Sequence, residues 1–163
     1  MTREDRLKLI KRLEELRATE DRAALATLRR ALSGRDADVL RTFRHIGYQL
    51  PSYPRDQDTC ILVSALFALH PLEGGVGNMG KHMARLRSAD ENKAQSVEHK
   101  LTALVTAQRE ALRLRLRQAV SLLAAGQVPV DWSQLLYDLD HWDNENRFVQ
   151  RQWASSFWRT DEN

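Results

Sequence analysis

Cysteine is nearly absent from this sequence of 163 residues, and so is any long apolar run. Cys60 is the only cysteine, so no intramolecular disulfide can form and a reducing compartment is expected. It lies in an apolar segment and is interpreted as a small buried residue. No stretch reaches the roughly 20 apolar residues that a membrane span requires. The start, MTREDRLKLIKRLEELR, is too charged for a secretory signal. We therefore expect a cytoplasmic protein that makes no membrane contact.

Patterns typical of catalysis are also missing. The five histidines include no close pair at ligand spacing, and no cysteine or carboxylate cluster completes a metal set. Asp138, Asp140 and Asp143 cannot share one helix face, so they do not resemble a carboxylate dyad. The glycine-rich residues 72–80, LEGGVGNMG, lack a Gly-Lys-Ser/Thr ending and are interpreted as a connector. The sequence predicts no enzyme, no metal site and no cofactor.

Positive charge is unevenly distributed. The net charge is only +3, which permits a polyanionic partner without requiring one. Residues 81–117 hold nine basic and four acidic side chains, whereas residues 131–163 hold three and seven. A partner with phosphates is expected to contact the basic middle of the chain, although solvated basic helices are common in proteins that bind nothing charged.

Helical spacing of apolar residues extends over almost the whole chain, and no convincing strand pattern is present. Gly34, Pro51, Pro71 and Gly126 mark interruptions between helices. Residues 59–70, TCILVSALFALH, are apolar on nearly all sides, which predicts a central helix surrounded by others. We predict an all-α fold, a bundle of about eight or nine helices. The chain is expected to form a single domain, residues 1–163, with possible lobes at residues 1–90 and 91–163.

The aromatic residues gather near the end of the chain, where all four tryptophans follow residue 131. Val149, Trp153 and Phe157 are four residues apart and therefore share one helix face. The preceding segment carries a matching stripe from Trp132 to Trp142. Two antiparallel helices closing on each other would bury these rings, so a packed core is the favoured interpretation. A platform on which bases stack is the alternative.

Several arginines form ridges beside these apolar faces. Arg147 and Arg151 are four residues apart and offset from the aromatic stripe. In the segment LRLRLR, Arg113 and Arg117 lie together at the edge of an apolar face, while Arg115 points elsewhere. Each ridge is interpreted either as a solvated helix face or as a phosphate-binding surface.

Several motifs resemble a known family. They are LATLRRAL (residues 25–32), LFALHP (66–71) followed by GNMG, LRQAV (116–120), and above all DWSQLLYDLDHW followed by VQRQWASSFW. In this order they are similar to the CasB family, the small subunit of the type I-E CRISPR surveillance complex Cascade. The resemblance covers most of the chain, and its most specific part is the terminal tryptophan pattern.

This resemblance implies a non-catalytic, all-helical subunit of an antiviral defence complex. The implied partners are a second copy of the protein, the backbone subunits, the large subunit, guide RNA and target DNA. Basic surfaces of the family help to hold target DNA and the displaced strand of the R-loop. The nucleic-acid-binding residues that we infer from the family motifs are Arg29, Arg30, Arg117, Arg147 and Arg151. Those inferred from the basic middle of the chain are Lys81, Arg85, Lys100 and Arg113.

The sequence departs from the family pattern at two places. Ser155 and Ser156 replace a charged pair before the final Phe-Trp, and His99 stands where an arginine is common. A different class of function also remains open. The protein is alternatively a helical adaptor whose arginines contact other proteins and not nucleic acid.

Overall fold

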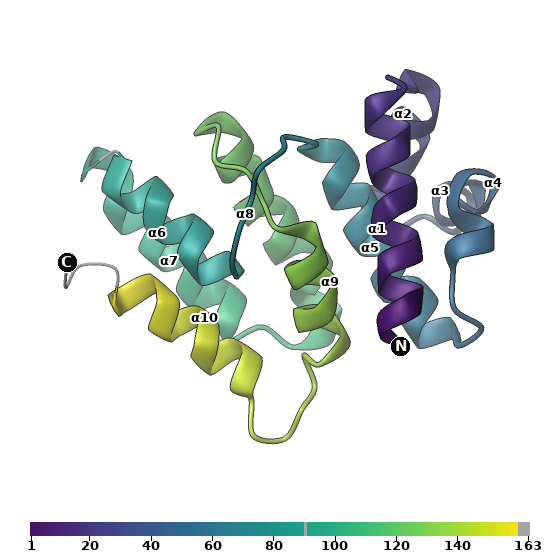
Figure 1. The fold of residues 1–163 in the computed structure, drawn as a ribbon. Helices are drawn as coiled ribbons and strands as arrows, with labels where there is room; N and C mark the ends of the chain where they lie inside the picture. Colours follow the sequence, from purple (N-terminus) through teal and green to yellow (C-terminus); the bar gives the residue numbers. More distant parts are fainter. Residues whose placement is uncertain (90, 160–163) are drawn as a thin grey trace. The chain divides into compact units, whose positions relative to one another are not determined.

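The structure, a computed structural model, describes residues 1–89 and 91–159. Every regular element within these ranges is helical, so the predicted all-α fold is confirmed (Figure 1). The chain divides into two compact units, the first comprising Met1–Pro71 and the second beginning at Leu72. The sequence suggested a possible lobe boundary at residues 90 and 91. The division falls earlier because the helix that follows Leu72 packs on helices of the second unit.

Helices α1 and α5 are the longest helices of the first unit, with 16 residues each. The α-helices of this unit are α1 (Arg3–Ala18), α2 (Arg22–Arg30), α3 (Asp36–Arg41), α4 (Phe43–Ile46) and α5 (Pro54–Leu69). Two short 3₁₀ segments, η1 (Ala31–Ser33) and η2 (Gly47–Gln49), connect them. Thr2 and Asp5 form a capping box that fixes the start of α1. Gly34 then adopts a left-handed conformation, with φ of 73°, and ends the α2–η1 segment.

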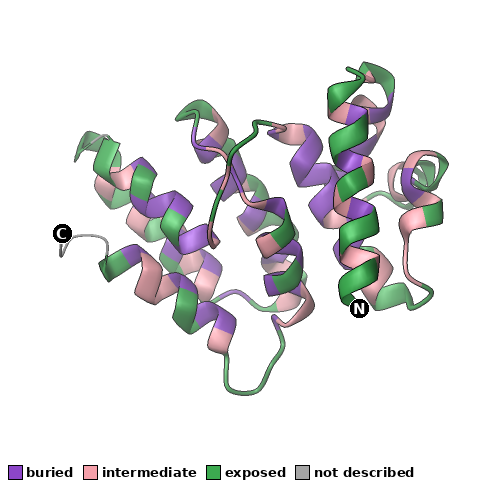
Figure 2. Ribbon diagram, in the orientation of Figure 1, coloured by how far each residue is buried: buried purple, intermediate pink, exposed green. Residues whose placement is uncertain are grey.

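Helix α5 is the core of the first unit, as its apolar composition predicts. Most of its side chains from Thr59 to Ala68 are buried (Figure 2). Cys60 is fully buried among them, which confirms its interpretation as a small buried residue. Helix α2 packs along α5 and contributes Ala24 and Leu28 to the same core. The exposed residues of α2 are Arg22, Ala23, Arg29 and Arg30.

The second unit contains the aromatic core, which includes the buried Trp132, Trp142 and Trp153. Its helices are α6 (Met79–Ala89), α7 (Ala94–Val105), α8 (Leu112–Ala125), α9 (Trp132–Asp140) and α10 (Phe148–Trp158), with 3₁₀ segments η3 (Glu91–Lys93) and η4 (Arg109–Ala111). Figure 1 shows α10 beside α6 and α7. The glycine-rich connector ahead of α6 is fixed by Asp131, whose carboxylate accepts a hydrogen bond from the Gly77 backbone N–H.

The aromatic stripes are buried as predicted. Val149, Trp153 and Phe157 have no exposed surface, and the rings of Trp142 and Trp153 lie 5.1 Å apart between centroids. The sequence predicts a hairpin in which α10 pairs with α9, but α10 packs most extensively on α6. Gly80 explains why α10 packs on α6. A Cβ atom at Gly80 would lie 1.9 Å from the Trp153 carbonyl oxygen, so only glycine permits the two backbones to approach so closely.

Asp138 links α9 to α10 through a buried hydrogen bond. Its carboxylate accepts from the Trp153 indole N–H at 2.6 Å and from the Gln134 amide at 2.8 Å. Asp138 is fully buried, and this burial raises the pKa of its carboxyl to about 6 from the usual 3.8. The sequence pattern excludes Asp138 from a carboxylate dyad or a paired metal site but assigns it no role, whereas the structure shows it as the acceptor that satisfies a core tryptophan.

Replacing the buried indole tests this core. Trp153→Ala is expected to cost about 3–5 kcal/mol of unfolding free energy, because it leaves a cavity and deprives Asp138 of its donor. Chemical denaturation followed by circular dichroism measures this loss. Trp158→Ala is the matched control, since Trp158 is 49% exposed and its removal leaves no internal cavity. Equal losses in the two variants would contradict the assignment of Trp153 as a core residue.

Asp138 also makes stability depend on pH. Its raised folded pKa means that its contribution to stability is complete below about pH 4 and is lost as the pH rises through about 6. We expect the free energy of unfolding of the wild type, relative to Asp138→Asn, to fall by about 2–3 kcal/mol between pH 4 and pH 7. Denaturant titrations of both proteins at several pH values measure this difference.

His82 changes the free energy of unfolding with pH in the opposite direction, and the comparison with Asp138→Asn removes this effect. Burial lowers the pKa of the His82 imidazole to about 4, so its contribution is lost as the pH falls from about 6.5 towards 4. His82 is unchanged in both proteins and cancels in the difference. A difference that stays constant from pH 4 to pH 7 would show that folding does not raise the pKa of Asp138.

Candidate nucleic-acid interface

The basic residues singled out in the sequence lie on the outside of helices. Arg29 and Arg30 occupy the last turn of α2 in the first unit, and both are exposed. Helix α2 buries Ala24 and Leu28 on its other side, so its packing turns both arginines toward solvent. Neither arginine side chain has a hydrogen bond or an ion pair with the described residues. These two guanidiniums therefore retain all their donors for an external anion.

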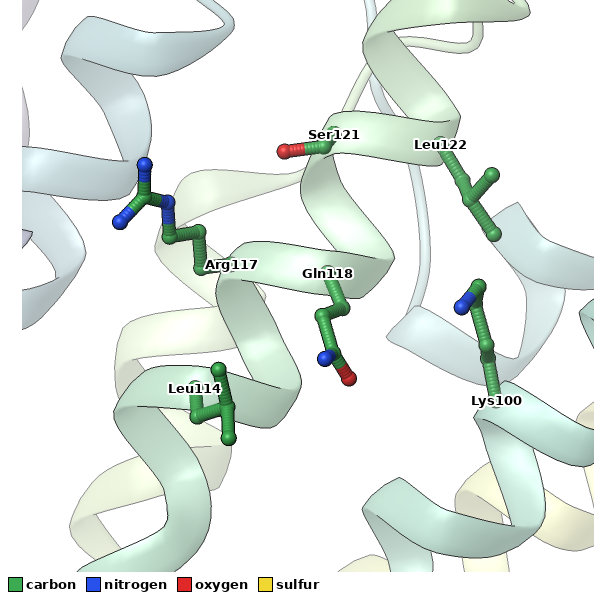
Figure 3. A pocket seen from close by; sticks show the side chains of 6 residues that line it. All are labelled: Lys100, Leu114, Arg117, Gln118, Ser121 and Leu122. Carbon is green, nitrogen blue, oxygen red and sulfur yellow. The ribbon is translucent and has the colours of Figure 1, made fainter.

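A second basic surface, which we call the α7–α8 groove, lies in the second unit. It is an open pocket of about 390 Å³ between α7 and α8. Its lining residues are Lys100, Leu114, Arg117, Gln118, Ser121 and Leu122. In Figure 3, Leu122 points toward Lys100, whereas Arg117 extends from the opposite side of α8. A cation therefore lies on each side of α8, and the pocket lining between them is polar and apolar.

Arg113 is a further cation on α8. It is exposed and lies one helical turn before Arg117, as the sequence spacing indicates. The apolar face that carries Leu112, Leu116 and Val120 is buried, which fixes the arginines at its edge. The alternation in LRLRLR therefore belongs to a helix and not to a strand.

Two further basic pairs occur in the second unit. Lys81 and Arg85 are exposed and lie one turn apart on α6. Arg147 and Arg151 are exposed at the start of α10, but they differ in their contacts. One guanidinium nitrogen of Arg147 donates to the Val105 carbonyl at 2.8 Å, whereas the Arg151 side chain makes no such bond in the described part of the chain. Arg147 is therefore held in place, and its other donors remain available.

Other arginines of the basic middle have internal roles. Arg109 pairs with the Asp143 carboxylate and donates to the Leu139 carbonyl at 2.8 Å. Arg87 donates to the Phe157 carbonyl at 3.2 Å. The excess of basic residues in the sequence thus divides into cations that stabilise the fold and cations that face solvent.

The structure also exposes basic residues that the sequence patterns did not single out. Lys8, Lys11 and Arg12 line a pocket of about 190 Å³ in the first unit, together with the fully exposed Tyr48. Two of these cations already have partners, because Lys8 pairs with Glu4 at 2.7 Å and Arg12 with Glu15 at 3.5 Å. The three- and four-residue spacing of the cations on α1 is visible in the sequence, but the neighbouring Tyr48 is not.

No group of three or more histidine, cysteine or carboxylate side chains within residues 1–89 and 91–159 could hold a metal ion. His82 has a lowered pKa because it is buried, and its Nε2 accepts a hydrogen bond from the Asp131 backbone N–H. Its role is structural. Among the helices of the described residues, none has the length and apolar character to cross a bilayer.

Comparisons with known proteins agree with this architecture. The CRISPR-associated protein Cse2 family matches residues 24–158, a range that includes every basic residue discussed above except those on α1. A Cse2 protein of Thermus thermophilus is 35% identical over 103 residues, which is 63% of this chain. The matched region spans 57% of that relative's own length.

Solved structures extend the similarity. The crystal structure of a Cse2-family protein from Thermus thermophilus has a TM-score of 0.81 and 27% identity, covering 94% of this chain and 97% of that chain. A chain of a CRISPR RNA-guided surveillance complex has a TM-score of 0.83 and 28% identity, covering 98% and 95%. The family resemblance inferred from the terminal tryptophan pattern is thus confirmed, and this chain belongs to the CRISPR-associated Cse2 family, also called CasB.

Proposed function

We propose that this protein is the non-catalytic small subunit of a type I-E CRISPR RNA-guided surveillance complex. In that complex it binds nucleic-acid backbone without reading sequence and stabilises target DNA and the displaced strand of the R-loop. The observation that carries this proposal is the set of exposed basic pairs, Arg29–Arg30, Lys81–Arg85, Arg113–Arg117 and Arg147–Arg151. The similarity to a chain of a surveillance complex supports the assembly.

Backbone binding fits the chemistry of these pairs. Guanidinium and ammonium groups neutralise phosphates and release condensed counterions, which gives affinity that is independent of sequence and decreases with salt. In three of the pairs, Lys81–Arg85, Arg113–Arg117 and Arg147–Arg151, the cations are four residues apart, about 6 Å along a helix axis, and offer a row of donors to a strand that follows the helix. Contacts of this kind to phosphates carry no sequence information.

Modest contacts to the backbone are sufficient to stabilise an R-loop. The heteroduplex is about as stable as the DNA duplex that it replaces, so contacts to the backbone shift the balance. A net charge of +3 predicts weak binding of the isolated protein to DNA. Within the complex, a second copy of the subunit, the backbone subunits, the large subunit and guide RNA would align these weak contacts, and multivalency would strengthen them. The complex would act in the cytoplasm, without membrane contact.

The first unit carries a feature suited to assembly with other proteins. Leu40, Phe43 and Tyr48 are exposed along α3, α4 and η2. Contiguous exposed apolar patches are typical of surfaces that contact a partner, and these three side chains are close together in the sequence. They also favour the alternative function, a helical adaptor whose arginines contact only proteins. The experiments below distinguish the two functions.

Removing paired arginines is expected to destabilise the R-loop without unfolding the protein. Arg29→Ala with Arg30→Ala, and Arg147→Ala with Arg151→Ala, should each shorten the lifetime of the R-loop in the assembled complex. The slope of log lifetime against log salt should decrease in magnitude by about 1 for each phosphate that the substitutions leave without a cation. The effect should be the same on targets of unrelated sequence, because the arginines bind the backbone.

A charge-matched control distinguishes the loss of local contacts from the effect of a lower net charge. Arg3→Ala with Arg22→Ala also removes two exposed positive charges, but on residues outside the proposed interface. It should leave the lifetime near that of the wild type. Wild-type lifetimes for all the paired variants across a salt series, with assembly intact, would favour the adaptor.

The α7–α8 groove predicts coupling between two of its residues. Lys100 and Arg117 line one pocket, so a strand held there would contact both, and the effects of Lys100→Ala and Arg117→Ala on R-loop lifetime should not be additive. A double-mutant cycle measures this coupling. A second cycle, pairing Lys100→Ala with Arg151→Ala, is the control, because Arg151 does not line the groove. Additivity in the first cycle would contradict a shared contact.

A further inference from the structure

One tryptophan does not belong to the aromatic core. Trp158 is 49% exposed, whereas Trp132, Trp142 and Trp153 are 5%, 3% and 0% exposed. It is the last residue of α10. A half-exposed indole is a large apolar surface to leave in water, since the burial of aromatic rings is strongly favourable. Its position therefore calls for an explanation other than packing.

Trp158 lies on the same side of α10 as Arg151. At about 100° per residue, these two residues fall within about 20° of each other around the helix, and Arg147 precedes them as the N-cap residue, with a left-handed φ of 53°. The buried face, with Trp153 at its centre, lies well away from this side. The distance along the axis from Arg151 to Trp158 is about 10 Å. Of the intervening residues, those nearest this line are Ala154 and Ser155, whose small side chains leave it open.

The Trp158 ring is fixed from one side. The Arg87 guanidinium carbon lies 5.5 Å from the centroid of the Trp158 ring and 4.3 Å from that of Phe157. The Phe157 and Trp158 rings are edge-to-face, with centroids 5.0 Å apart. These contacts restrain the indole and leave its accessible half facing solvent. A restrained ring binds a flat ligand at a lower entropic cost than a mobile one.

We propose that Trp158 stacks on an unpaired base of a single strand whose phosphates contact Arg151 and Arg147. This inference deepens the proposed function and rests on it, because the phosphates would use the same arginine ridge. Aromatic rings combined with a positively charged track are characteristic of proteins that bind single strands without sequence preference. Bases in a duplex are stacked on one another and cannot offer a free face. The α10 ridge therefore selects the displaced strand over duplex DNA.

The alternative occupant of Trp158 is an apolar side chain of another protein. The charge beside the ring argues against it, since Arg151 is exposed on the same side of α10 and makes no ion pair with the described residues. The test below includes this alternative as an outcome.

The experiment compares single-stranded and duplex DNA with the full-length protein. The probes are an oligonucleotide of mixed sequence, about 20 nucleotides long, and the duplex of the same sequence, at low salt so that weak binding is measurable. Trp158→Ala should weaken binding of the single strand at least about fivefold and leave duplex binding nearly unchanged. Trp158→Phe should restore part of the affinity, because it keeps a ring. Tyr53→Ala removes an exposed ring from the first unit and is the matched control, expected to have no effect.

Two further measurements report stacking directly. Single-stranded DNA should quench the indole fluorescence of the wild type, and Trp158→Phe should abolish this quenching because the other three tryptophans are buried. An oligonucleotide that carries 5-iodouracil should photocrosslink to Trp158, as identified by mass spectrometry of the peptide. Thermal unfolding of each variant confirms that the fold is retained.

The outcomes separate this inference from the proposed function. If Arg147→Ala with Arg151→Ala weakens binding but Trp158→Ala leaves the single-strand preference and the quenching unchanged, the stacking inference is overturned and the backbone function stands. If neither variant alters binding to any DNA or the R-loop, both are overturned. If Trp158→Ala instead prevents incorporation into the complex while DNA binding by the isolated protein is unchanged, Trp158 contacts a protein and the stacking inference is overturned.

Discussion

The second unit depends on burying the Trp153 indole while keeping its N–H hydrogen-bonded. The ring is too large to be left in water without a substantial loss of stability, yet its N–H would be costly to bury without an acceptor. Asp138 provides that acceptor, and Gly80 provides the space for the backbone that carries the ring. These two requirements connect the consecutive helices α9 and α10 to α6, which lies much earlier in the chain.

This arrangement determines where the charges of the second unit lie. Once Val149, Trp153 and Phe157 face inward, the arginines of α10 have to lie on the outer side of the helix. The buried face of α8 places Arg113 and Arg117 at its edge in the same way. A nucleic-acid surface of this kind therefore needs no dedicated pocket. It follows from helices whose apolar faces are fully used by the core.

The same reasoning explains why the isolated protein is expected to bind DNA weakly. The exposed cations are spread over several helices as pairs, and the total charge is small. Each pair contributes a limited, salt-dependent free energy. Such a surface becomes effective when other subunits hold a strand in place beside it, as in an R-loop whose two duplex states are close in free energy. An exposed ring at one end of a ridge would add a preference for unpaired bases to a contact that is otherwise only electrostatic.

The sequence by itself determined the helical fold, the buried aromatic stripe and the family. Spacing by three and four residues fixes which side chains share a helix face, because the geometry of the α-helix is local. It also determined that Arg147 with Arg151 and Arg113 with Arg117 form ridges. These conclusions need no knowledge of what each helix packs against.

Only the tertiary structure decided which helix each face contacts and which cations remain available. It paired α10 with α6, because close approach at Gly80 depends on a residue far away in the sequence. It assigned Arg109 and Arg87 to internal contacts and left Arg151 and Arg117 facing solvent. Burial turned Asp138 into a core acceptor and left Trp158 half exposed. Hydrogen bonding and burial depend on neighbours that the fold brings together, so local sequence patterns could not reveal them.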